Sequence, residues 1–162
     1  MRIIYLDLDG VLANFQKAYF YTDWTHPENE NRFRHAVLRR RIFEDLELMC
    51  DARELLNYVG TLKNINIEIL TSLGSSRVEV ADEAKLQKKI WLAKHKIHYK
   101  PNFVNYGEAK GELYADIGTI LVDDIHKNIK SFEKNDGIGH LHTDAASTII
   151  KLEELLRDEK NI

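Results

Sequence analysis

The stretch Arg2-Ile3-Ile4-Tyr5-Leu6-Asp7-Leu8-Asp9-Gly10 decides the fold of this chain. Its first part is a short apolar run, and two carboxylates and a glycine follow at once. An uninterrupted apolar run of this length is typical of a strand that is buried on both faces of a parallel sheet. We therefore expect the first strand to end where the carboxylates begin.

Similar apolar runs recur along the chain and alternate with longer segments of helical periodicity. The further expected strands are 65–70, 103–104, 119–122 and 138–141, and the expected helices are 51–62, 76–97 and 145–157. Strands that alternate with helices favour parallel pairing through right-handed crossovers. The predicted fold class is α/β, a Rossmann-like open parallel sheet with helices on both faces.

Two of the expected helices carry detailed patterns. Segment 51–62 places its apolar residues on one stripe that should face the core, namely Ala52, Leu55, Leu56, Val59 and Leu62. Segment 76–97 opens with Ser76-Arg77-Val78-Glu79, which has the pattern of a capping box. Its apolar stripe is predicted to be Leu86, Ile90, Ala93 and Ile97.

Residues 14–50 interrupt the alternation between the first strand and the first regular helix. This segment is rich in aromatic side chains and contains Arg39-Arg40-Arg41. We interpret it as a small helical cap inserted after the first strand, so that 1–13 and 51–162 form the α/β core. The alternative is a long crossover whose aromatic residues pack into that core.

Composition limits the kinds of partner that the chain can have. The chain has 162 residues, which is the size of one ordinary domain, and its formal net charge is -3. A chain with this balance has no overall positive field to hold a long nucleic acid, and no apolar run is long enough to cross a membrane. The single cysteine, Cys50, and the strand-like start favour a cytoplasmic location.

Polar side chains follow three of the predicted strands at the point where each strand ends. They are Asp7 and Asp9, then Thr71 and Ser72, then Asp123 and Asp124. Ligands of open α/β sheets bind beyond the carboxyl ends of the strands, so these groups should converge if the strands are neighbours. Clustered carboxylates repel one another unless a cation joins them, and Mg²⁺ prefers such oxygen ligands. Asp123-Asp124 alone would also suit a turn and a helix N-cap.

The first carboxylate pair suggests phosphoryl transfer. Asp7 and Asp9 point to the same side if the extended backbone persists, and Gly10 lets the chain turn away. One carboxylate can then attack phosphorus while the other serves as acid and base. We assign these roles to Asp7 and Asp9, respectively. Thr71 and Ser72 can donate to phosphate oxygens, and the candidate cations are Lys85, Lys88, Lys89 and Lys110.

The motifs follow one another along the chain as an Asp-x-Asp pair, a Thr-Ser pair, a helical lysine and an Asp-Asp pair. In this order they resemble the four motifs of the haloacid dehalogenase superfamily of phosphatases. Within it, the chain is most similar to the 5′(3′)-deoxyribonucleotidases, through residues 9–15, Phe43-Glu44-Asp45-Leu46-Glu47 and Lys88-Lys89-Ile90-Trp91. The resemblance implies that Asp7, the backbone carbonyl of Asp9 and Asp123 bind Mg²⁺. It also implies that Thr71, Ser72 and Lys88 hold the phosphate and that Phe15 and Phe43 line the nucleoside pocket. Relatives have a phosphate-facing arginine near 105–107, where this chain has none, and Lys110 is the candidate to replace it.

The expected function is Mg²⁺-dependent hydrolysis of (deoxy)nucleoside 5′-monophosphates through an aspartyl-phosphate on Asp7. Two alternatives stay open at this stage. One keeps the chemistry and changes the substrate to a polynucleotide end or a sugar phosphate. The other is a non-catalytic phospho-aspartate switch similar to the receiver domains. Receiver domains, however, place the phosphorylated aspartate after the third strand and not after the first.

Overall fold

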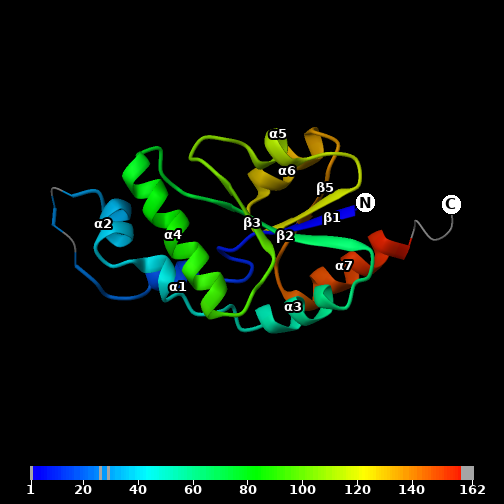
Figure 1. The fold of residues 1–162 in the computed structure, drawn as a ribbon, viewed down its shortest axis with the longest axis horizontal. Helices are drawn as coiled ribbons and strands as arrows, with labels where there is room; N and C mark the ends of the chain where they lie inside the picture. Colours follow the sequence, from blue (N-terminus) through cyan, green and yellow to red (C-terminus); the bar gives the residue numbers. More distant parts are fainter. Residues whose placement is uncertain (1, 26, 29, 158–162) are drawn as a thin grey trace.

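The structure is a computed structural model that describes residues 2–25, 27–28 and 30–157 (Figure 1). Residues 1, 26, 29 and 158–162, which the predicted domain ranges include, lie outside the described residues. Within the described part, the strands are β1 Arg2–Leu6, β2 Ile65–Ser72, β3 Lys100–Val104, β4 Thr119–Asp123 and β5 Ile138–Leu141. They form one parallel sheet in the order β3-β2-β1-β4-β5, which confirms the predicted fold class.

Helices cover both faces of this sheet. Their bounds are α1 Phe15–Phe20, α2 Arg32–Leu38, α3 Ala52–Gly60, α4 Val78–Lys94, α5 Lys110–Tyr114, α6 His126–Lys134 and α7 Ala145–Arg157, with a 3₁₀ helix η1 at Ile42–Glu44. Figure 1 shows α5 and α6 on one side of the sheet and α3 and α7 on the other. The sheet is therefore the middle layer of three, as its apolar runs predict.

The side chains of β1 alternate between the two layers of core. Ile4 and Leu6 join the larger core with α3, α4 and α7, whereas Tyr5 packs with Ile129 and Phe132 of α6. This alternation follows from the period of two in an extended strand. Each face of the strand is buried because each face meets helices.

Strand register places the predicted site residues side by side. Leu6 at the end of β1 is opposite Ile69 of β2 and Val122 of β4. The chain positions just beyond, with Asp7, Thr71 and Asp123, therefore share one edge at the centre of the sheet. The expectation that these three strands are neighbours is confirmed.

Helix α3 agrees with its predicted stripe, but α4 does not. Ala52, Leu55, Leu56 and Val59 are buried, and Leu62 packs against the core. On α4, in contrast, Leu86 is 48% exposed and Ile90 39% exposed, and Ala93 is exposed as well, so the predicted stripe is wrong there apart from Ile97. The buried face of α4 carries Val80, Ala81, Ala84, Gln87, Lys88, Trp91 and Leu92.

The predicted capping box at the start of α4 is also wrong. The N-cap residue is Arg77, which is extended and makes no side-chain cap hydrogen bond. Ser75 instead accepts a hydrogen bond from the Arg77 backbone nitrogen at 3.1 Å. The Ser75 hydroxyl thus stabilises the turn before the helix, a local bond that competes with helix capping.

Segment 14–50 contains α1, α2 and η1 and packs on α4. Its residues Ala36, Val37, Ile42, Phe43 and Leu46 belong to the same buried cluster as the strands. The Trp91 ring of α4 donates a hydrogen bond to the Leu46 carbonyl at 2.8 Å. The division into core and cap stays a prediction. In the described part of the chain, no helix is both long and apolar enough to cross a membrane.

Candidate active site

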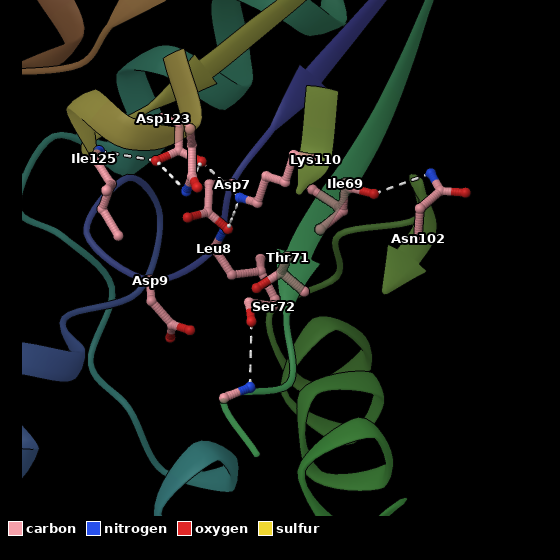
Figure 2. A network of polar contacts seen from close by, with 12 residues as sticks. Asp7, Leu8, Asp9, Ile69, Thr71, Ser72, Asn102, Lys110, Asp123 and Ile125 are labelled. Atoms are coloured by element: carbon pink, nitrogen blue, oxygen red, sulfur yellow. Dashed lines mark hydrogen bonds and ion pairs between the residues drawn. The ribbon is translucent and has the colours of Figure 1, made fainter. Parts of the chain in front are cut away.

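Asp7 lies at the end of β1 and is held there by the backbone. Its amide donates to the Val122 carbonyl of β4 at 3.0 Å, and its Oδ1 accepts the Leu8 amide at 2.8 Å. The carboxylate is almost fully buried. Figure 2 shows it at the centre of a polar network formed by the neighbouring strand ends.

Three carboxylates meet at this position. Asp7, Asp123 and Asp124 each offer one oxygen, and these oxygens lie within 4.8 Å of one another. Burial raises the pKa of Asp124 to about 6, and repulsion from Asp7 and Asp123 adds to this effect. The Asp124 Oδ1 is buried and has no hydrogen-bond partner. An unpartnered buried carboxylate oxygen beside two further carboxylates fits a divalent cation with oxygen ligands.

Gly10 makes room for Asp124. A Cβ atom at position 10 would lie 2.1 Å from Asp124 Oδ2, and the φ angle of Gly10 is +84°. Both facts require glycine here, because other residues rarely adopt this backbone conformation and none could avoid the carboxylate. The glycine of the first motif thus supports the acidic group of the fourth.

Asp123 is occupied by protein donors, unlike Asp124. Its Oδ1 accepts the Ile125 amide at 2.8 Å, and Asn128 of α6 donates to both oxygens at 3.1 Å and 2.9 Å. Lys110 donates to Oδ2 at 2.6 Å. The more available oxygen of the acidic pair therefore belongs to Asp124, although the resemblance implied Asp123 as the metal ligand.

Lys110 joins the nucleophile candidate to the acidic pair. Its Nζ lies 3.0 Å from Asp7 Oδ1 and 2.6 Å from Asp123 Oδ2, and the side chain is buried (Figure 2). Burial alone lowers the pKa of Lys110, but Asp7 and Asp123 outweigh burial, so the pKa is raised and the ammonium stays charged. The following residue, Gly111, permits this position: a Cβ there would lie 2.1 Å from the Ser131 carbonyl of α6.

The second lysine at this edge of the sheet is Lys88 of α4, which lies beside Asp9 and Thr71. Its Nζ donates to Asp9 Oδ2 at 2.6 Å, to Thr71 Oγ1 at 2.8 Å and to the Ser72 carbonyl at 2.8 Å. The other lysine candidates, Lys85 and Lys89, instead lie over the Phe103 ring at 5.5 Å and 6.0 Å. Two of the four predicted cations, Lys88 and Lys110, thus lie among the carboxylates.

The carboxylates of Asp7 and Asp9 have different partners. The chain bends after β1, where the Leu8 carbonyl accepts the amides of Val11, Leu12 and Ala13, so the extended backbone does not persist to Asp9. The Asp9 side chain lies with Lys88 and outside the group of three carboxylates. Burial raises the pKa of Asp9, against the opposing effect of Lys88. A raised pKa suits a group that must carry a proton.

The phosphate-binding candidates of β2 differ from each other. Thr71 is fully buried, and its hydroxyl contacts Lys88. The Ser72 hydroxyl instead accepts the Gly74 amide at 3.2 Å, inside the turn that follows the strand (Figure 2). Thr71 therefore shares the lysine with Asp9, whereas Ser72 contacts Lys88 only through its carbonyl.

Aromatic rings cover the Lys88 side of the site. The Lys88 ammonium lies 4.5 Å from the centre of the Phe43 ring, and Phe43 stacks on Phe15 at 5.4 Å. Phe33 packs edge-on against both rings and fills the space in front of Gly74. The two predicted substrate-binding rings are thus together. Phe33 was not among the predicted site residues, although it belongs to the same aromatic-rich segment.

Asn128 and Gln87 were also missed. Asn128 lies in the first turn of α6, four residues after Asp124, which places its amide back towards the strand end. That spacing is the only signal in the sequence. Gln87 directly precedes Lys88 and is fully buried, but nothing in the apolar pattern of the helix indicates it.

A cavity of about 840 Å³ lies at the other end of the sheet. It is lined at the strand starts by Arg2, Ile65 and Gly118 and contains none of the predicted site residues. Volume alone does not define a site, and the grouped carboxylates and lysines are at the opposite edge.

A protein-family model matches most of this chain. The family model described as 5′ nucleotidase, deoxy (Pyrimidine), cytosolic type C protein matches residues 18–157. The match includes Thr71, Lys88, Lys110 and the acidic pair, and it begins after Asp7 and Asp9. No curated protein matches the chain.

One solved structure similar to this chain is a hydrolase from Streptococcus pneumoniae TIGR4. The TM-score is 0.53 and the sequences are 16% identical, over 96% of this chain and 98% of the other. At this identity, the likeness concerns the fold, which the two chains share over nearly their whole lengths.

Proposed function

Because the chain belongs to the cytosolic type C family of deoxy (pyrimidine) 5′-nucleotidases, which are phosphomonoester hydrolases, we propose that it hydrolyses deoxynucleoside 5′-monophosphates in a Mg²⁺-dependent reaction through an aspartyl-phosphate on Asp7. The observation that carries the proposal is the position of Asp7. Its carboxylate pairs with the ammonium of Lys110 at 3.0 Å and has an oxygen within 4.8 Å of an oxygen of Asp124.

The two oxygens of Asp7 have different environments. Oδ1 accepts both the Leu8 amide and Lys110. Among the described residues, no donor contacts Oδ2. We assign Oδ2 as the attacking oxygen, since a carboxylate oxygen without a donor keeps its nucleophilic lone pairs.

Asp7, Asp124 and the backbone carbonyl of Asp9 would hold the metal, with Asp123 behind them. Mg²⁺ bound there would neutralise charge on the phosphoryl group and so favour attack by an anionic carboxylate. Asp123 then acts chiefly through Lys110 and Asn128, because these donors already occupy its oxygens.

The reaction has two steps. In the first, Asp7 Oδ2 forms a bond to phosphorus, the bond from phosphorus to the ester oxygen breaks, and Asp9 gives its proton to the leaving oxygen. In the second, water gives a proton to Asp9 and attacks phosphorus, which breaks the bond to Asp7 and releases phosphate. Lys88 and Thr71 hold the transferred group and keep Asp9 aligned.

The remaining predicted residues concern the substrate. We propose that segment 14–50 acts as a cap and that Phe15 and Phe43 contact the nucleoside, because the Phe43 ring lies over the Lys88 ammonium and the Phe15 ring stacks on Phe43. Lys110 contacts the transferring phosphate in this account, and Ser72 binds it through the turn at Gly74. A cytoplasmic location belongs to the proposal and agrees with the family's printed description.

A substrate panel tests the proposal. Phosphate release should be measured for deoxynucleoside monophosphates, 3′-phosphorylated oligonucleotides and sugar phosphates, with Mg²⁺ and with a chelator. We expect the monophosphates to be the best substrates, and only with Mg²⁺. Equal or faster release from the oligonucleotides or sugar phosphates would refute the substrate assignment, and turnover in the chelator would refute the metal requirement.

A further inference from the structure

Gln87 is a polar side chain in a place where the helix should be apolar. It lies on the inner face of α4, next to Lys88, and has no exposed surface. A buried amide is costly unless its donors and acceptor are satisfied. The hydrogen bonds of the Gln87 amide therefore indicate why a polar side chain occupies this buried position.

Both ends of the Gln87 amide bind segment 14–50. The Oε1 accepts the Phe43 backbone amide at 3.2 Å, and the Nε2 donates to the Val37 carbonyl at 2.8 Å. Nε2 also donates a hydrogen bond to Glu83 Oε1, on the preceding turn of α4, at 2.9 Å. One side chain thus joins the end of α2 to the start of η1 and holds both to the helix that carries Lys88.

The hydrogen bond from the Phe43 amide to Gln87 holds the backbone of a residue whose aromatic ring lies at the site. Phe43 is almost fully buried, and its ring lies 4.5 Å from the Lys88 ammonium. The same ammonium binds Asp9 and Thr71. Because the ring covers one side of this ammonium, whatever is esterified to a phosphate bound at Lys88 must pass beside it.

We propose that Gln87 is a positioning residue that fixes the Phe43 ring over Lys88 and so sets the affinity for the nucleoside part of the substrate. This inference rests on the proposed function, and it adds a residue that acts through Phe43 and not on phosphorus. Neighbouring contacts support a segment that is fixed in place, since Trp91 and Glu83 of α4 also bind it, through Leu46 and Arg41.

The test compares a nucleotide with the same sugar phosphate that lacks a base. Gln87→Met keeps the length of the side chain and removes its hydrogen bonds. For this variant we expect the KM for thymidine monophosphate to rise about tenfold, which corresponds to the loss of roughly one well-placed interaction. The KM for 2-deoxyribose 5-phosphate should change less than about twofold, because that substrate makes no base contact.

Thr119→Val is the matched control. Thr119 is buried at the start of β4, far from Phe43, and its hydroxyl bonds only to Asp116. It should lower the melting temperature without changing the ratio of the two KM values. If Gln87→Met merely destabilises the fold in the same way, with an unchanged ratio, the inference is wrong.

Two further measurements identify Phe43 as the intermediary. In a Phe43→Leu background, Gln87→Met should no longer raise the KM for the nucleotide, and a full additional rise would contradict the proposal. Hydrogen exchange on the wild-type protein needs no variant to fold: the Phe43 amide should be protected, and exchange as fast as in an exposed loop would overturn the inference. Should the wild type fail to hydrolyse nucleotides at all, the proposed function fails and not this hydrogen-bond arrangement.

Discussion

The ammonium of Lys110 lies 3.0 Å from the Asp7 carboxylate, and both groups are buried at the end of β1. An ion pair at this position gives the nucleophile a fixed orientation and a partner for the charge that phosphoryl transfer moves. Lys110 also stabilises the fold, because without this lysine Asp7 and Asp123 would lose their buried counter-ion.

Lys110→Met should therefore affect both activity and stability. We expect kcat to fall about 100- to 1000-fold, as for the loss of one preorganised donor at a developing charge. The unfolding free energy in a chelator should fall by about 3–5 kcal/mol, because breaking a buried ion pair leaves uncompensated carboxylates. Lys89→Met is the control, since Lys89 lies over Phe103, and it should change neither quantity appreciably. A Lys110 variant with wild-type kcat would contradict the assigned role.

Asp124→Asn should separate metal binding from folding. Without metal, this variant should melt roughly 2–6 °C higher than the wild type, because the substitution removes repulsion among three neighbouring carboxylates. Added Mg²⁺ should raise the melting temperature of the wild type and not of the variant. Thermal melting with and without Mg²⁺ checks both parts. An equal Mg²⁺ response in the two proteins would show that Asp124 is no ligand.

Gly10→Ala tests the contact between the first and fourth motifs. The added methyl group must displace the Asp124 carboxylate, and the positive φ angle costs about 1–2 kcal/mol for a residue with a Cβ atom. We expect lower stability and a Mg²⁺ requirement for activity that shifts to at least tenfold higher concentration. Gly107→Ala has the same backbone constraint but open space around it, so it should lose stability alone. An unchanged Mg²⁺ requirement in Gly10→Ala would contradict this contact.

His140 and His142 predict acid sensitivity of the fold. Both rings contact the buried Thr148 hydroxyl, and burial lowers the pKa of each. At these two sites the unfolded chain binds more protons than the folded one as the pH falls below about 6.5, so each histidine removes stability in that range. The raised pKa values of Asp9 and Asp124 act in the opposite direction, so the histidine effect is measured as a difference between two proteins. From pH 7 to pH 5 the unfolding free energy of the wild type should fall relative to that of His140→Gln, and parallel pH profiles would refute the prediction.

Strands and the order of the motifs were predictable from the sequence, because both depend on local features. The apolar runs of β1, β2 and β4 indicate burial on two faces, and each run ends in the polar residues that occupy the shared edge. The helix stripe of α3 was also predictable, since every residue on it serves the core. Helix α4 was not, because its inner face carries Gln87 and Lys88, whose burial depends on partners elsewhere in the chain.

The sequence could predict which residues form the site, but not which hydrogen bonds and ion pairs join them. The sequence could indicate that Asp7, Thr71, Lys88 and Asp124 converge. It could not indicate that Asp9 turns towards Lys88, because that depends on the bend after β1. Nor could it distinguish the two members of the acidic pair, since only the positions of Lys110 and Asn128 leave Asp124 as the freer group.

The most direct test of the central claim is chemical trapping of the nucleophile. Borohydride reduces an aspartyl-phosphate to homoserine, which peptide mass spectrometry can locate after the enzyme has been mixed with deoxynucleoside monophosphate and Mg²⁺. We predict homoserine at position 7, dependent on both substrate and Mg²⁺, and no turnover by Asp7→Asn. Homoserine at another position, or full turnover by Asp7→Asn, would contradict the account.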